Sequence, residues 1–108
     1  MPRPEPIAQA DLRVGVIRTA KVNPKARNPS MVLEIDLGPL GVLTSSSQIT
    51  NLYRPEDLPG RTVIVAAGLG ARRVGGVKSH VLTLGVPTPD GITLLTADPG
   101  AKPGDPVF

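Results

Sequence analysis

Proline and glycine recur throughout this chain and divide it into short segments. The 108 residues include 13 prolines and 12 glycines, and the segments between them are rich in valine, isoleucine and leucine. Helix interiors tolerate proline and glycine poorly, whereas short β-strands are ordinarily bounded by them. The pattern therefore predicts an all-β barrel or sandwich, and the length suits one domain over residues 1–108.

Residues 31–37 carry the clearest strand signal, because apolar Met31, Leu33, Ile35 and Leu37 alternate with the other positions. Further strands are expected at residues 12–22, 42–46, 61–67, 78–86 and 92–97. Ser45 and Gln48 have the spacing of a capping box, which predicts a short helix that ends before Pro55. The tail at residues 98–108 is expected to cover an edge of the barrel.

Three strands, a short helix and two strands is the order of the OB-fold, a five-stranded Greek-key barrel, here with an extra C-terminal strand and tail. OB-folds bind ligands through the face of strands 2 and 3 and through loops 1–2 and 4–5. The basic residues fall in or beside these loops, within two stretches, residues 13–33 and 61–89, that contain no acid. The candidate RNA-binding residues are Lys25, Arg27, Arg72, Arg73, Lys78 and Ser79. Ordinary solvated charges remain the alternative, since the net charge is only +3.

Several classes of function are disfavoured by the residues that the chain lacks. It has no cysteine and one histidine, His80, so neither a disulfide framework nor a metal site is expected. The serines of residues 44–50 have no neighbouring base that could activate them as nucleophiles. The glycine-rich loop at residues 68–77 does not end in the Gly-Lys-Ser/Thr of a nucleotide-hydrolysing site. We therefore expect neither an enzyme nor a bound cofactor. No signal peptide or membrane-spanning run is found, and we expect a cytoplasmic protein without membrane insertion.

Four strings in the chain resemble known proteins. Residues 11–15 resemble the start of the tRNA-binding domain family, and residues 45–50, 53–58 and 72–79 resemble its free-standing CsaA members in particular. The resemblance implies an OB-fold homodimer that acts as a chaperone in protein secretion, binding unfolded or exported polypeptides and also tRNA. The alternative is a tRNA-binding module that acts in trans on tRNA or a synthetase. We expect residues 4–12 and the C-terminal tail to contribute to the dimer interface.

The chain departs from this resemblance in its aromatic content. It has one tyrosine and one phenylalanine, and it has aliphatic residues at four positions where CsaA proteins commonly have tyrosine or phenylalanine, namely Met31, Leu37, Leu69 and Val77. Because single-strand binders stack bases on aromatic rings, RNA binding here is expected to rest on phosphate contacts and shape. Aliphatic pockets also suit a polypeptide, for which the candidate residues are Ser46, Gln48, Leu69 and Val77.

Overall fold

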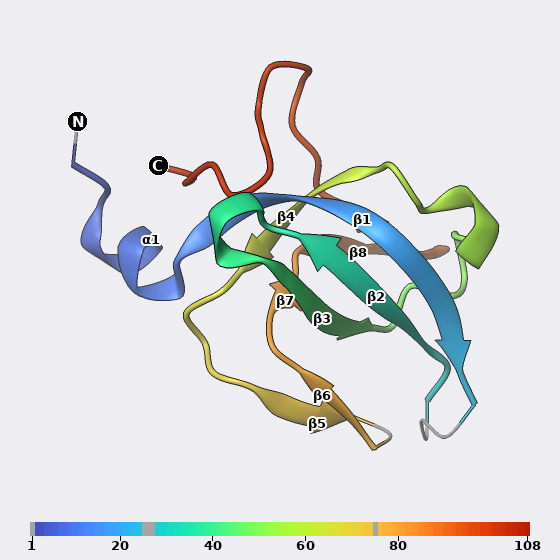
Figure 1. Ribbon diagram of the computed structural model, residues 1–108. Helices are drawn as coiled ribbons and strands as arrows, with labels where there is room; N and C mark the ends of the chain where they lie inside the picture. The colour runs from blue at the N-terminus through green and yellow to red at the C-terminus, as the bar shows by residue number, and fades with distance from the viewer. Residues whose placement is uncertain (1, 25–27, 75) are drawn as a thin grey trace.

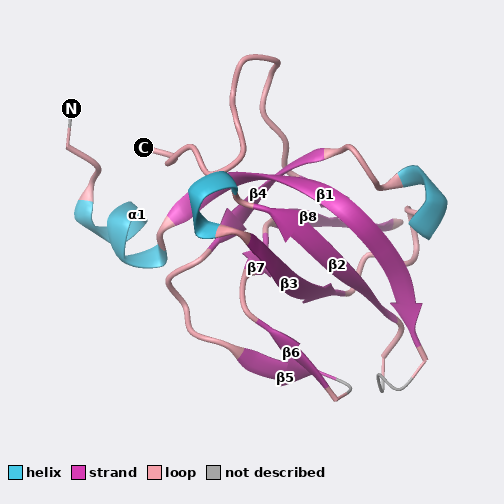
Figure 2. Cartoon of the chain, in the orientation of Figure 1, coloured by secondary structure: helices cyan, strands magenta, loops and turns pink. Residues whose placement is uncertain are grey.

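The chain forms a curled antiparallel sheet accompanied by two small hairpins (Figure 1, Figure 2). The computed structural model describes residues 2–24, 28–74 and 76–108. The sheet has five strands in the order β3-β2-β1-β4-β7, and the hairpins are β5-β6 and β8-β9. The strands are β1 (Leu12–Asn23), β2 (Ser30–Asp36), β3 (Val42–Ser47), β4 (Thr62–Ala66), β5 (Arg72–Val74), β6 (Val77–Ser79), β7 (Leu82–Thr83), β8 (Gly85–Thr88) and β9 (Gly91–Leu94). The predicted all-β, OB-like architecture is confirmed.

Strand β1 is long because it belongs to both halves of the barrel. Its first residues pair with β4, from Leu12 opposite Ala66 to Val16 opposite Thr62, and the rest of the strand pairs with β2. Gly15 lies where β1 passes closest to the core, and a Cβ atom there would lie 2.5 Å from Ile35 Cγ2. Glycine therefore allows the backbone of β1 to pack directly on β2.

The alternation along residues 31–37 is confirmed. Met31, Leu33, Ile35 and Leu37 are each fully buried, whereas Glu34 is exposed. They form one core cluster with residues of β1 and β4, including Ile17, Val63 and Val65. The core lies on the inner face of the curled sheet.

The short helix expected after Ser45 is absent from the structure. Strand β3 continues to Ser47, and the stretch before β4 contains only a 3-10 turn at Pro55–Asp57. The Ser45 hydroxyl is buried, where it accepts a hydrogen bond from Thr83 Oγ1 at 2.8 Å, and so it does not cap a helix. The α-helix of the described chain is instead α1 (Glu5–Ala10).

The strand expected at residues 78–86 is divided into β6, β7 and the start of β8. The division occurs where the backbone amides of His80 and Val81 both donate to Thr44 O, at 2.7 and 3.3 Å. These bonds attach the chain to β3 between the β5-β6 hairpin and β7. The last predicted strand, 92–97, is β9, which pairs with β8 in a separate hairpin.

The C-terminal tail covers the edge of β1 that β2 leaves free, as expected. Val14 N donates to Asp105 O at 2.9 Å, and Gly104 N donates to Val14 O at 2.7 Å. The N-terminal segment is tied to the same place, because Arg3 Nε donates to Val107 O at 3.0 Å. Both ends of the described chain therefore lie at one end of the barrel (Figure 1).

One carboxylate links these two segments. Asp11 Oδ1 accepts hydrogen bonds from Arg3 Nη1 at 3.0 Å and from Arg13 Nε at 2.9 Å. Arg13 also donates to Gly104 O at 3.0 Å. Asp11 has a left-handed backbone, with φ of 50°, a conformation that Asp and Asn adopt more readily than most residues.

Candidate functional site

Three basic residues of the β5-β6 hairpin, Arg72, Arg73 and Lys78, do not share one face. Arg72 pairs with Ser79, and Arg73 pairs with Lys78. Directly paired residues share one face of a hairpin and successive residues alternate. Arg72 and Ser79 therefore lie on the face that contacts β3, whereas Arg73 and Lys78 lie on the opposite, outer face. The sequence predicted a single loop site containing Arg72 and Arg73, but the strand pairing places the two residues on different faces.

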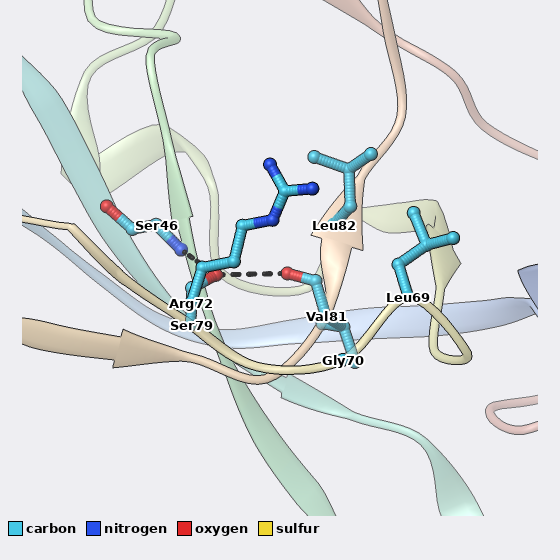
Figure 3. Close-up of a pocket in the computed structure, with 7 residues that line it drawn as sticks. All are labelled: Ser46, Leu69, Gly70, Arg72, Ser79, Val81 and Leu82. Atoms are coloured by element: carbon cyan, nitrogen blue, oxygen red, sulfur yellow. Dashed lines mark hydrogen bonds between the residues drawn. The ribbon is translucent and has the colours of Figure 1, made fainter.

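A cavity of about 200 Å³ lies beneath the inner face of the hairpin (Figure 3). Its apolar wall is made by Leu69, Val81 and Leu82, and its polar side by Ser46, Arg72 and Ser79. Leu69 and Leu82 are 49% and 50% exposed. The cavity therefore offers accessible aliphatic surface beside a guanidinium group.

Ser79 has a structural role in this cavity. Its hydroxyl accepts a hydrogen bond from Ser46 N at 3.0 Å and donates one to Val81 O at 3.1 Å. The residue is 9% exposed. It therefore joins β3 to the end of β6, and its donor is already used within the protein. Its contact with RNA stays a prediction.

Gln48 lines a second cavity of about 380 Å³, which borders the first. Ser46 and Leu82 belong to both cavities. Leu84 and Ile92 add apolar surface to the second. We call the two adjoining cavities the β3-β7 groove. Three of the four candidate peptide-binding residues, Ser46, Gln48 and Leu69, line it.

Val77, the fourth candidate, lies elsewhere. It lines a separate cavity of about 310 Å³, between the hairpin and the ends of β1 and β2, together with Lys21, Pro24 and Val32. Pro24 directly precedes the predicted RNA-binding residues Lys25 and Arg27, which lie outside the described residues. Lys21 was missed as a site residue, although it belongs to the acid-free stretch 13–33.

The ion pairs leave the basic side chains of the hairpin without acidic partners. Within the described residues, the salt bridges join Arg3 and Arg13 to Asp11, Arg18 to Asp36, and Arg54 to Glu56 and Asp57. No salt bridge in that part of the chain involves Arg72, Arg73 or Lys78. Arg73 Nη1 does donate to Gly76 O at 3.4 Å.

Two of the four positions singled out for lacking an aromatic ring lie in the core. Met31 and Leu37 are completely buried, so no ring at either place would meet a base. Only Leu69 and Val77 border a cavity. Tyr53 is also structural, because its hydroxyl accepts a hydrogen bond from Leu94 N at 2.9 Å.

His80 serves the fold as well. In addition to the backbone bond from its amide to Thr44 O, its Nδ1 accepts a 3.4 Å hydrogen bond from Thr44 N. Val81 and Leu82, which follow it, line the groove. No signal in the sequence identified these two as site residues, because they lie inside an expected continuous strand.

The putative tRNA binding domain model matches residues 12–106 of the chain. The chain belongs to this tRNA-binding domain family. It is similar over its whole length to two solved structures, the CsaA chaperone protein from Picrophilus torridus, with 34% identity and a TM-score of 0.90, and the chaperone CsaA from Bacillus anthracis, with 38% identity and a TM-score of 0.88. The match covers 100% and 99% of those chains, so the CsaA-type resemblance is confirmed.

Curated relatives are much longer proteins. The methionine–tRNA ligase of Flavobacterium psychrophilum is 39% identical over 84 residues, which are 78% of this chain and 12% of the ligase. The mouse aminoacyl tRNA synthase complex-interacting multifunctional protein 1 is 30% identical over 103 residues, 95% of this chain and 33% of that protein. The chain therefore spans from an eighth to a third of these relatives. Within its described residues, no helix is long and apolar enough to cross a membrane.

Proposed function

We propose that this CsaA-type domain is a chaperone that holds an extended segment of unfolded or exported polypeptide in the β3-β7 groove. The observation that carries the proposal is that two cavities lie next to each other and share Ser46 and Leu82 as lining residues. A small molecule is usually held in one concave pocket. An extended polypeptide instead presents its side chains at regular intervals, and these can enter neighbouring pockets. Both structures that the chain matches over its whole length are chaperones, which supports the same function.

Contacts in the groove suit a ligand of variable sequence. Leu69 and Leu82 present exposed aliphatic surface, which attracts apolar side chains without a directional requirement. The Ser46 hydroxyl donates a long hydrogen bond to Ser30 Oγ, at 3.5 Å, and the Gln48 side chain is exposed. Both offer polar groups that a polypeptide backbone can bond.

The test is binding of a fluorescent unfolded peptide, measured by anisotropy, together with suppression of aggregation of a denatured client protein. The double variant Leu69→Ser and Leu82→Ser removes the apolar wall. It should weaken binding roughly tenfold or more, since burying one leucine contributes about 1.5–3 kcal/mol. Leu40→Ser is the matched control, because Leu40 is similarly exposed (43%) but lies outside the groove. Equal binding by the double variant and the control would reject the groove as the site.

A second candidate function is binding of tRNA, alone or on a synthetase. It is favoured by Arg73 and Lys78, which share the outer face of the hairpin and have no acidic partner within the described residues. Family membership supports it as well. A gel-shift titration with folded tRNA tests this candidate, and absence of a shift at low salt would count against it.

We also propose a cytoplasmic homodimer. A chain of 108 residues has a modest core, and an interface would bury exposed apolar residues such as Val42 and Phe108, which are 53% and 52% exposed. The terminal segments remain the predicted contributors. Light scattering should give twice the monomer mass of 11.2 kDa, and a mass equal to the monomer at micromolar concentration would contradict the dimer.

A further inference from the structure

Arg72 is a charged side chain at the edge of a largely apolar cavity. In Figure 3 it extends from the hairpin beside Leu82, above the wall of the cavity. Within residues 2–24, 28–74 and 76–108 it makes no hydrogen bond or ion pair, and the cavity lining contains no Asp or Glu. Its neighbour Arg73, by contrast, bonds to the backbone of its own hairpin.

The surroundings of Arg72 favour a negatively charged ligand group. A guanidinium binds a planar carboxylate through two parallel hydrogen bonds. The adjoining Leu69, Val81 and Leu82 exclude water from part of its surface when a ligand fills the cavity, and an ion pair there is screened less than one in open solvent. The groove therefore combines an apolar pocket and an anion-binding group within the reach of one ligand segment.

The spacing of an extended chain indicates which residues occupy the two positions. Residues i and i+2 of a strand lie on the same face, about 6.6 Å apart, whereas residue i+1 points away. An apolar side chain in the cavity between Leu69 and Leu82 thus leaves the side chain two positions away along the segment on the same side, facing the groove. A glutamate or aspartate at that position provides the carboxylate that Arg72 lacks.

We propose that the β3-β7 groove selects polypeptide segments in which an acidic residue lies two positions from an apolar residue, and that Arg72 determines this preference. The proposal rests on the proposed polypeptide-binding function. It adds a charge preference to a site whose other contacts are apolar surface and uncharged polar groups. Arg72 is thereby assigned to the polypeptide, and the outer-face Arg73 is not.

The experiment compares three fluorescent peptides in the same host sequence, in which one leucine has the same residue two positions away on both sides: Glu-x-Leu-x-Glu, Gln-x-Leu-x-Gln and Lys-x-Leu-x-Lys. Their binding is measured by anisotropy at one salt concentration. The natural protein should bind the Glu peptide about tenfold more tightly than the Gln peptide, and the Lys peptide least. Arg72→Gln should abolish the difference between Glu and Gln. Arg72→Glu should reverse the order, so that the Lys peptide binds best.

Arg73→Gln is the matched control, because it removes the same charge from the opposite face of the hairpin. It should keep the order of the three peptides, and far-UV circular dichroism checks that each variant is folded. Equal affinity of the natural protein for the Glu and Gln peptides, or an order unchanged in Arg72→Glu, would overturn the charge preference while leaving polypeptide binding intact. If none of the peptides binds, the proposed function itself fails. Displacement of the Glu peptide by tRNA from the natural protein but not from Arg72→Gln would assign Arg72 to RNA instead.

Discussion

Arg72 and Arg73 follow one another in the chain, yet they lie on opposite faces of the β5-β6 hairpin, because Arg72 pairs with Ser79 and Arg73 with Lys78. The inner face borders the β3-β7 groove, and the outer face carries Arg73 and Lys78 into solvent. The two proposed ligands, polypeptide and RNA, would therefore meet separate faces of one hairpin. Substitutions at adjacent positions should then affect different ligands.

The first prediction concerns RNA. Arg73→Ala with Lys78→Ala should weaken binding to folded tRNA and flatten its dependence on salt, because each phosphate contact contributes about 0.7–0.9 to the slope of log K against log salt. Filter-binding titrations at several salt concentrations measure both quantities. Arg72→Ala is the comparison and should have the smaller effect. A slope unchanged in the double variant would remove the outer face from the RNA site.

The second prediction concerns base stacking. With aliphatic residues at Leu69 and Val77, the natural protein should bind folded tRNA more tightly than an unstructured oligonucleotide of equal length. Leu69→Phe with Val77→Phe should narrow this gap, since a stacked base contributes about 1–3 kcal/mol. Fluorescence competition at one fixed salt concentration measures the gap. Unstructured RNA that binds the natural protein as tightly as tRNA would contradict recognition by shape.

A phenylalanine at Met31 should act differently from one at Leu69 or Val77. Because Met31 is completely buried, Met31→Phe adds a ring to a filled core and should lower the free energy of unfolding by about 1–3 kcal/mol. It should leave the relative affinity for the two RNAs unchanged. Urea denaturation together with the competition assay distinguishes a core position from a surface position. A gain in single-strand binding would contradict the buried placement.

The third prediction concerns acid stability. Burial by itself raises the pKa of Asp11, but the hydrogen bonds and charges of Arg3 and Arg13 outweigh it and lower the pKa overall. A lowered pKa in the folded state means that the stabilisation is fully present above the unfolded carboxyl value of about 3.9 and is lost as the pH falls through the lower folded value. Asp11→Asn keeps the left-handed backbone accessible and should cost about 1–2 kcal/mol near neutral pH.

Denaturant unfolding of Asp11→Asn and the natural protein from pH 7 to pH 2.5 tests this. The difference between them should be constant at neutral pH and shrink below about pH 4. Asp36→Asn is the control, because its partner Arg18 has a half-exposed side chain, and its effect should be smaller. A difference that grows towards acid pH would reject the assignment.

The fourth prediction concerns the tail. Gly104 and Gly100 both have positive φ, 88° and 119°, but a Cβ at Gly104 would collide with Leu37 O, whereas nothing lies near one at Gly100. Gly104→Ala should therefore lower Tm by several degrees more than Gly100→Ala, since both share the backbone strain and only one adds a clash. Thermal unfolding by circular dichroism measures the difference. Equal losses would show that the tail does not pack on the turn after β2.

The sequence predicted most reliably the segments in which one face is buried. Residues 31–37 alternate because one side faces the core, and the structure has that register. The prediction of a helix after Ser45 was wrong. Ser45 and Gln48 have the spacing of a helix cap, but the Ser45 hydroxyl instead bonds across the barrel to Thr83. Helix α1 was missed although Pro6 near its start is compatible with the first helical turn.

The candidate site was only partly predictable, because its geometry depends on long-range pairing. The basic content of residues 72–78 was evident, but the division between Arg72 and Arg73 follows from strand pairing inside an expected loop. Likewise, Ser46 and Leu82 line both cavities only because β3 and β7 approach each other in the folded chain. Local sequence patterns contain no information on such approach.

The pairing of the tail with β1 also bears on how the chain folds during its synthesis. The bond between Arg13 and Gly104 joins residues 91 positions apart, so β1 leaves the ribosome long before its edge partner. At about 5–20 residues per second, that edge stays open for roughly 5 to 20 seconds. Native contacts of such separation form slowly even in the complete chain. A protein of this architecture thus passes through an interval in which the start of its first strand is an open, aggregation-prone edge.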